Sequence, residues 1–274
     1  MNILSIQSSV AYGHAGNSSA VFPLQRLGHE VWPVFTVHFS NHTGYGEWRG
    51  PVFDPETVRD VITGIEERGV LPRCDAVLSG YQGAPTMGEV IVDAVARVKA
   101  ANPDVTISYT IPITPDGMLP NAVALMQMVK DHGLDLDVVN IMAMDYGAGD
   151  WGHRGDQGRN AIDAARNTIA QLRQIGLDAK VGITPMIGIN DVQTEIFTLQ
   201  DAQELLAFAK DNPDVASLGI WSLGRDETGT PGQLTVGGSG ITQDPYGFTT
   251  IFEGITDAGA GYDTHSGLTI VNAL

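Results

Sequence analysis

LDVVNIMAMDYGAG, residues 136–149, is the stretch that decides the fold class of this chain. Its core, Val138–Met144, is almost continuously apolar and is followed by Asp145-Tyr146-Gly147. An apolar run of this length is typical of a strand covered on both faces, as in a parallel sheet. The chain has six further runs of this kind, which we predict as strands: Asn2–Gln7, Val31–Phe39, Ala76–Tyr81, Val105–Ile113, Lys180–Ile187 and Ala216–Leu223.

Amphipathic segments with recognisable ends lie between these runs. Asp54-Pro55 predicts a helix start, because aspartate can cap a first turn and proline fits the first helical position. Thr198 and Asp201 have the spacing of a capping box. A further helix is predicted from about Met87 to Ala101. Strands that alternate with helices predict βα units around a largely parallel sheet.

The composition of the 274-residue chain narrows the classes of function. The chain has 15 Lys and Arg against 32 Asp and Glu, a net charge of −17, and 43% apolar residues. The apolar content predicts an ordered, packed chain. The acidity argues against nucleic acid or an anionic membrane as a partner, because contacts to phosphate need cations. We therefore expect a small neutral molecule as the ligand, if the chain has one.

Cysteine and histidine usage gives no sign of a metal site or a disulfide. Cys74 is the single cysteine, and the seven histidines, among them His14, His42 and His153, lack the spacing of a ligand pair. We expect no metal and no cofactor. The first residues lack a basic segment, and no stretch approaches the ~18 apolar residues of a membrane span, so we expect a cytoplasmic protein.

Three segments in the first hundred residues resemble the pyridoxal kinases of the ribokinase superfamily. They are IQSSVAYGHAGNSSAVFPLQRLG at Ile6–Gly28, VWPVFTVHFSNHTGYGEWRG at Val31–Gly50 and CDAVLSGYQG at Cys74–Gly83. The resemblance implies that Ser8, Thr43 and Tyr81 surround a pyridoxal ring. Hydroxyl groups suit the polar edge of a pyridine, and a phenol ring can pack on its face. Ordinary turn and strand-end chemistry is the alternative for these three residues.

A kinase of this family also needs a glycine-rich GxGD segment, which opens a helix and carries the catalytic aspartate. The sequence has no such segment. Its nearest glycine-rich strings, Gly237–Gly240 and Gly147–Gly155, are not followed by the aspartate and an apolar helix. Phosphoryl transfer depends on positioning the phosphates and a metal ion. We therefore expect no pyridoxal phosphorylation.

The later part of the chain resembles a different family, the family 18 glycoside hydrolases, whose bacterial chitinases are (β/α)8 barrels. The motifs are VTISYTIPITPDG at Val105–Gly117, LDVVNIMAMDYGAG at Leu136–Gly149, KVGITPMIGINDVQTEIFTLQDA at Lys180–Ala202 and IWSLGRD at Ile220–Asp226. The resemblance implies a sugar subsite formed by Met142, Asp145, Tyr146 and Trp221 at strand ends, where barrel enzymes build their sites. Core packing is the alternative for Met142 and Trp221.

This family's DxxDxDxE signature, which ends in the catalytic acid, is also missing from the sequence. Asp135-Leu136-Asp137 is followed by two valines, and Glu195 and Glu204 fall in a later loop and helix. Loss of the acid removes the ~10²–10⁴ contribution of general acid catalysis. We therefore expect no chitin hydrolysis and assign no catalytic residue.

These observations lead to one interpretation with two alternatives. We predict a chimera, natural or engineered, of a pyridoxal kinase-like segment 1–104 and a family 18 chitinase-like half-barrel 105–254, with a tail 255–274, together in one compact domain. Its function is expected to be non-catalytic sugar binding. The alternatives are a pyridoxal-binding, kinase-like protein without the catalytic aspartate and nucleotide site, and a scaffold without a ligand.

The predicted fold is a barrel-like α/β domain, with an open doubly wound parallel sheet as the alternative. We expect the strands that begin at Val105, Val138, Lys180 and Ala216 to be parallel and sequential neighbours. Asn2–Gln7 is expected beside Ala216–Leu223, which would nearly close the ring. Trp48–Phe53 or Leu268–Leu274 are the candidates for an eighth strand.

Overall fold

The computed structural model of the chain describes residues 1–13, 15–43, 46–81, 83, 86–147, 153, 155–235 and 237–255. These residues form two compact units. Unit 1 consists of Met1–Ile107 and Gln127–Asp135, and unit 2 consists of Ser108–Met126 and of residues 136–255. Each unit has its own parallel sheet, so we describe each by itself.

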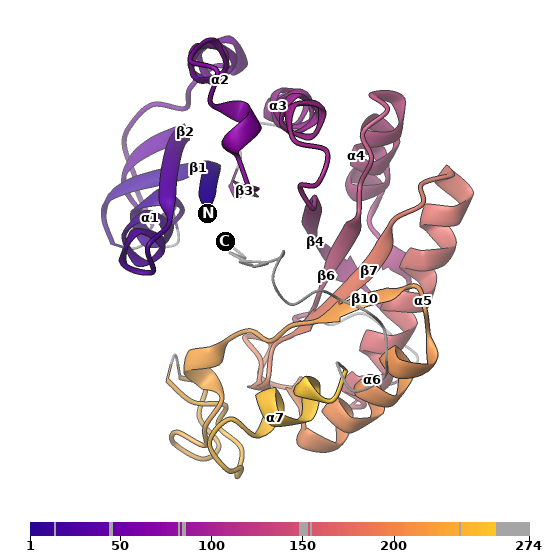
Figure 1. The fold of residues 1–274 in the computed structure, drawn as a ribbon. Coiled ribbons are helices and arrows are strands. Elements are labelled where there is room, and N and C mark those ends of the chain that lie inside the picture. The colour runs from indigo at the N-terminus through magenta and orange to yellow at the C-terminus, as the bar shows by residue number, and fades with distance from the viewer. Residues whose placement is uncertain are drawn as a thin grey trace. The chain divides into compact units, whose positions relative to one another are not determined.

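The sheet of unit 1 has three parallel strands, β1 (Asn2–Tyr12), β2 (Glu30–Asn41) and β3 (Ala76–Ser79), in the order β2-β1-β3 (Figure 1). Helices α1 (Asn17–Arg26), α2 (Pro55–Glu67) and α3 (Met87–Ala101) and the short η2 (Leu71–Arg73) connect them. Leu24 of α1 packs with Ile3 and Val31, while the next β2 residue, Trp32, lines a cavity together with Ile65 near the end of α2. Successive strand residues point to opposite faces, so helices cover both faces of this sheet.

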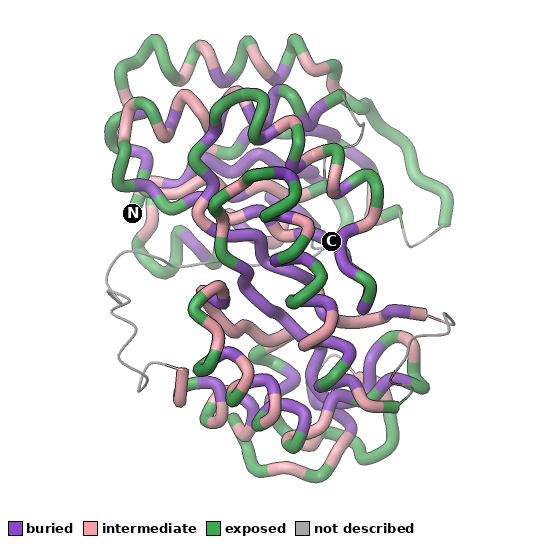
Figure 2. Tube along the Cα trace, turned by 90° about the vertical axis from the view of Figure 1, so that its right-hand side faces the viewer, coloured by how far each residue is buried: buried purple, intermediate pink, exposed green. Residues whose placement is uncertain are grey.

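The sheet of unit 2 has the order β10-β7-β6-β4-β5. Strands β4 (Ser108–Thr114), β6 (Val138–Ala143), β7 (Lys180–Pro185) and β10 (Val215–Leu218) are parallel, and the short β5 (Gly117–Met118) is antiparallel to β4. Helix α4 (Pro120–Asp131) begins in unit 2, and its residues from Gln127 belong to unit 1. The other elements of unit 2 are α5 (Gln157–Ile175), β8 (Gly188–Ile189), β9 (Ile196–Phe197), α6 (Leu199–Asp211), η3 (Leu223–Arg225) and α7 (Gly247–Glu253). Figure 2 shows most of the strand residues as buried.

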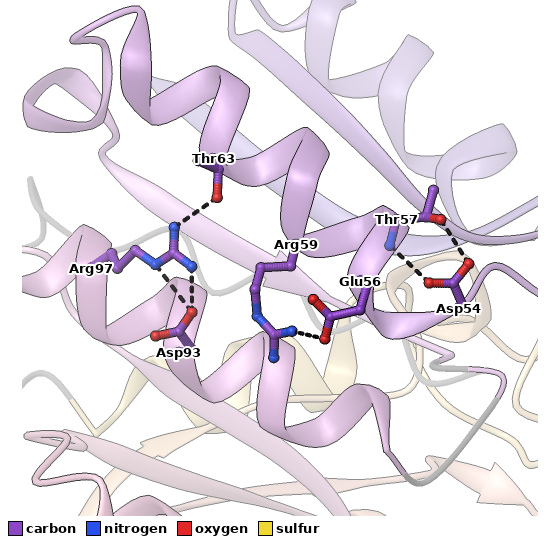
Figure 3. Close-up of polar contacts among 7 residues, drawn as sticks. All are labelled: Asp54, Glu56, Thr57, Arg59, Thr63, Asp93 and Arg97. Carbon is purple, nitrogen blue, oxygen red and sulfur yellow. Dashed lines mark hydrogen bonds and ion pairs between the residues drawn. The ribbon is translucent and has the colours of Figure 1, made fainter.

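The predicted helix starts are confirmed. The Asp54 carboxylate accepts hydrogen bonds from the backbone N–H and the hydroxyl of Thr57, and these bonds hold the pKa of Asp54 below its usual value (Figure 3). Thr198 and Asp201 form the expected capping box at the start of α6. Both starts follow from local sequence, because the capping group lies three residues from the N–H that it satisfies.

Arg97 joins the two helices that pack side by side in unit 1. Its guanidinium pairs with Asp93 on its own helix α3 and donates to Thr63 Oγ1 on α2 at 3.2 Å (Figure 3). It also donates to Glu66 Oε2 on α2 at 2.8 Å. These carboxylates raise the pKa of Arg97. The contact fixes α2 relative to α3 on one face of the unit 1 sheet.

The predicted strand neighbours are partly confirmed. β4, β6, β7 and β10 are parallel and adjacent in sequence order, as expected. The expected barrel is not observed in the described part of the chain, because β1 lies between β2 and β3 and β10 is an edge strand paired with β7. Consecutive βα units pair with each other first, and this leaves β1 no open edge for β10. The alternative of an open parallel sheet describes each unit better.

Of the two candidates for an eighth strand, the structure tests only Trp48–Phe53. Val52 forms a single antiparallel bridge with Val37, so Trp48–Phe53 is a returning loop rather than a barrel strand. Leu268–Leu274 lies outside the described residues. Among the helices that the structure describes, none combines the length and the apolar character needed to cross a bilayer.

Candidate functional site

Strand β3 of unit 1 ends at Ser79, while its neighbours β1 and β2 continue together to Tyr12 and Asn41. Ser79 is in register with Ile6 of β1, and this is the last pair of the two strands. Two of the predicted pyridoxal residues follow this pair: Ser8 lies two residues after Ile6 within β1, and Tyr81 lies two residues after Ser79. In open α/β sheets, ligands bind in the crevice outside the carboxyl ends of the strands. We call this edge, formed by Ser8, Thr36, Gly80 and Tyr81, the carboxyl edge of unit 1.

Ser8 lies where the pairing of β1 with β2 shifts register, between Gln7 and Ser9. Its side chain is 6% exposed and faces Gly16, just before helix α1. A Cβ on Gly16 would come within 2.3 Å of Ser8 Oγ. None of the described residues forms a hydrogen bond with this hydroxyl, so it can act as a donor or an acceptor toward a ligand.

Tyr81 presents its ring at the same edge, and its backbone is held on two sides. The ring is 49% exposed. The Tyr81 carbonyl accepts a hydrogen bond of 2.6 Å from Thr36 Oγ1, and the preceding residue, Gly80, donates its N–H to Ile6 at 3.2 Å. An exposed aromatic ring on a fixed backbone can stack on a flat ligand.

Thr43, the third predicted residue, is not brought to Ser8 and Tyr81. It lies on the segment Asn41–Phe53, which we call the β2 flap. This segment returns along β2: Pro51 accepts the N–H of His38, and Phe53 donates its N–H to Thr36, both at 3.0 Å. Asn41 pairs with Tyr12, four residues beyond Ser8 along β1. Thr43 is exposed and lies two residues past Asn41, so β2 carries it away from the other two residues.

A buried polar cluster under this edge was missed from the sequence. The Asn17 amide nitrogen donates to the carbonyls of Ser5, Gln7 and Val34 at 3.2–3.3 Å, and its oxygen accepts from Ser5 Oγ at 2.7 Å. Gln7 in turn donates to Ser5 Oγ at 2.9 Å. Ser5 and Gln7 are 0% and 1% exposed. Two polar residues on one face of a buried strand are the signal that could have revealed the cluster.

The four residues predicted as a sugar subsite lie in unit 2 at the corresponding end of its sheet. Met142 is in β6, and Asp145 and Tyr146 follow that strand. Trp221 follows β10, where it exchanges backbone hydrogen bonds with Pro185 and Ile187 after β7. Strand β7 separates β6 from β10, so Trp221 is two strands away from the other three residues.

The carboxylates near Asp145 tie loops together. Asp145 Oδ1 accepts the N–H of Val192 at 2.9 Å, and Glu195 accepts the N–H groups of Tyr146 and Gly147 at 3.0 and 2.9 Å. Burial raises the pKa values of both carboxyl groups. Among the described residues, no group of three His, Cys, Asp or Glu side chains is placed to hold a metal ion.

Comparison with known proteins gives two kinds of similarity, and no family model matches the chain. A pyridoxal kinase PdxY of Leifsonia xyli is 55% identical over 148 residues, which cover 50% of this chain and 52% of the relative. A pyridoxal kinase PdxY of Rubrobacter xylanophilus is 72% identical over 103 residues, 38% of this chain and 36% of the relative. The chain thus spans about half the length, or less, of these curated relatives.

One solved structure to which the chain is similar is that of a different enzyme. The catalytic domain of a hyperthermophilic chitinase from Pyrococcus furiosus matches with a TM-score of 0.65 and 25% identity, over 95% of this chain and 87% of that domain. The chain is therefore similar to pyridoxal kinases in sequence and has a chitinase as a structural neighbour.

These findings correct the expected function. We expected a chimeric, non-catalytic protein that keeps a chitinase-like sugar subsite, and this expectation is wrong. The curated relatives with 55–72% identity are named pyridoxal kinases, which favours the kinase-like alternative. The three kinase-like segments in the first hundred residues are stronger evidence of function than the absence of the GxGD segment. The description as an engineered barrel chimera fails for the same reason.

Proposed function

We propose that the chain is a phosphotransferase of the pyridoxal kinase type and binds pyridoxal at the carboxyl edge of unit 1. One observation carries the proposal. Ser8 and Tyr81, from segments far apart in the chain, each lie two residues after the last register pair of β1 and β3, Ile6 with Ser79, in a protein up to 72% identical to pyridoxal kinases over 103 residues.

The chemistry of the edge suits the ligand. Pyridoxal is a flat pyridine ring with a phenolic hydroxyl, an aldehyde and a hydroxymethyl group. The half-exposed Tyr81 ring offers a face for stacking, and the unpaired Ser8 hydroxyl offers a hydrogen bond to the ring's polar edge. We expect Thr43 to contribute less to pyridoxal binding. It is exposed, and it follows Asn41, which pairs with Tyr12 four residues beyond Ser8.

The reaction would transfer a phosphoryl group from a nucleoside triphosphate to the hydroxymethyl oxygen of pyridoxal. The formal charge of −17 on the chain opposes the approach of a free polyphosphate. We therefore propose a magnesium-complexed nucleotide as the phosphoryl donor, because the cation neutralises the phosphates and aligns them. The sequence-based expectation was a single small neutral ligand, and the nucleotide would be a second, charged substrate.

Calorimetric titration with pyridoxal tests the binding step. We expect Ser8→Ala and Tyr81→Ala to weaken binding about tenfold each, the effect of losing ~1.4 kcal/mol, and Thr43→Ala to weaken it less. Tyr246→Ala, which removes a 59% exposed tyrosine of unit 2, is the matched control and should leave binding unchanged. Wild-type protein that fails to bind pyridoxal would refute the proposal.

A second assay tests turnover. Wild-type protein with pyridoxal, ATP and Mg²⁺ should form pyridoxal phosphate, and Ser8→Ala should lower kcat/KM for pyridoxal by at least the factor seen in binding. Binding without turnover would show that the kinase part of the proposal is wrong while the binding part stands.

A further inference from the structure

The backbone that follows β3 lies across the sheet toward β2, although β1 separates the two strands. Gly80 still donates its N–H to Ile6 of β1. One residue later, the Tyr81 carbonyl is bonded to Thr36 of β2. At Gly83, a Cβ would come within 2.6 Å of Val37 Cγ1, also on β2. The segment that presents Tyr81 is thus fixed by β2 rather than by its own strand.

The side chain of Thr36, which holds the backbone at Tyr81, is fully buried. The residue is 0% exposed, and its hydroxyl donates 2.6 Å to the Tyr81 carbonyl across 45 positions of sequence. The Tyr81 ring has no comparable support, since it is 49% exposed and none of the described residues hydrogen-bonds to its phenol oxygen. The place of the ring therefore depends on the place of the backbone.

Gln7 holds the same segment from the other side. A Cβ on Gly80 would lie 2.6 Å from Gln7 Oε1 and 2.9 Å from Gln7 Cβ. Gln7 is itself held by its hydrogen bond to Ser5 Oγ. The backbone just before Tyr81 therefore has contacts on both sides, and neither contact involves the Tyr81 ring.

We infer that Thr36 is a positioning residue of the pyridoxal site, which sets the Tyr81 ring at the carboxyl edge through its hydrogen bond to the Tyr81 carbonyl. The inference rests on the proposed function. It assigns to Thr36 no contact with the ligand, so any effect of Thr36 on binding must pass through Tyr81.

A double-mutant cycle on pyridoxal binding tests this dependence. Thr36→Val keeps the side-chain shape and removes the hydroxyl, and we expect the Kd for pyridoxal to rise about tenfold because the Tyr81 carbonyl loses the hydrogen bond that holds it. Thr36→Ser keeps the hydroxyl and should stay within about twofold of the wild type. In the Tyr81→Ala background, Thr36→Val should change Kd less than about twofold.

Thr168→Val is the matched control. Thr168 is also 0% exposed, and its hydroxyl also donates to a backbone carbonyl, that of Ala164 at 2.8 Å, but it lies in α5 of unit 2. This variant should lower Tm and leave Kd unchanged. If Thr36→Val does not fold, Thr36→Ala removes the same hydroxyl and enters the same cycle.

The outcomes separate the two proposals. Wild-type protein that does not bind pyridoxal overturns the proposed function, and this inference with it. If the wild type binds pyridoxal but Thr36→Val weakens binding equally with Tyr81 present and in Tyr81→Ala, the inference alone is overturned. Thr36 would then act on the site by another route. An unchanged Kd in Thr36→Val also overturns it.

Discussion

Gly16 lies between helix α1 and Ser8, and its replacement by alanine should destabilise unit 1 far more than the same change at Gly28. Both glycines have positive φ, 55° at Gly16 and 86° at Gly28. An alanine in the left-handed helical region costs about 1–2 kcal/mol, and the backbone of Gly16, with ψ −133°, lies outside even that region, so its cost is at least as large. The two positions differ in the room for a methyl group. Nothing lies within 4 Å of a Cβ on Gly28, whereas a Cβ on Gly16 would lie 2.2 Å from the Ser8 carbonyl oxygen.

The second contribution follows from that overlap. Relief of the contact requires β1 and the start of α1 to separate by roughly 1 Å, and forced rearrangements of this kind cost about 1–3 kcal/mol. We therefore expect Gly16→Ala to lower the free energy of unfolding by about 2–5 kcal/mol and Gly28→Ala by about 1–2 kcal/mol. Gly16→Ala should also weaken pyridoxal binding, because it displaces Ser8.

Labelling of Cys74 by a thiol reagent in urea measures these effects in unit 1. Cys74 is the single cysteine of the sequence and is 0% exposed, so labelling requires unfolding of the unit that contains it. Burial also raises the pKa of its thiol, which suppresses the reactive thiolate in the folded protein. Equal losses for the two glycine variants, within about 0.5 kcal/mol, would refute the close packing of Gly16 on Ser8.

Two further predictions concern unit 2. Asp226 is 2% exposed and accepts the N–H groups of Phe248 and Thr249, so Asp226→Ala should lower the free energy of unfolding by about 3 kcal/mol, measured by circular dichroism in urea; an unchanged midpoint would contradict this role. Burial raises the pKa of Glu195 above 4.5, so the folded state keeps its proton to higher pH than the unfolded chain. The wild type should therefore lose stability relative to Glu195→Gln as pH rises from 4.5 through that raised pKa; a difference independent of pH would contradict it.

Local chemistry was predictable from the sequence, and pairing between distant segments was predictable only in part. Helix starts at Asp54 and Thr198 depend on groups three residues apart, so the sequence contains the whole interaction. The order of β4, β6, β7 and β10 follows from consecutive βα units. The position of β1 was predicted wrongly, because apolar periodicity reports that a strand is buried and not which strand lies beside it.

The candidate site shows the same division. The resemblance to a kinase family named Ser8 and Tyr81, and each of them lies two residues after the last register pair of β1 and β3. Thr36, Gln7 and Asn17 were not named, because a threonine in an apolar run and polar residues beside glycines also occur at ordinary strand ends and turns. Their role depends on contacts across 10 to 73 positions of sequence, which only the fold supplies.

The residues that hold unit 1 together also form its carboxyl edge, and this overlap limits what single substitutions can show. Asn17 joins the start of α1 to β1 and β2, so its loss should affect stability and binding together. Tyr81 differs, since its half-exposed ring is not needed for packing. An effect on pyridoxal binding is therefore informative when it depends on the presence of the Tyr81 ring, and a change in Tm without that dependence reports the stability of the sheet alone.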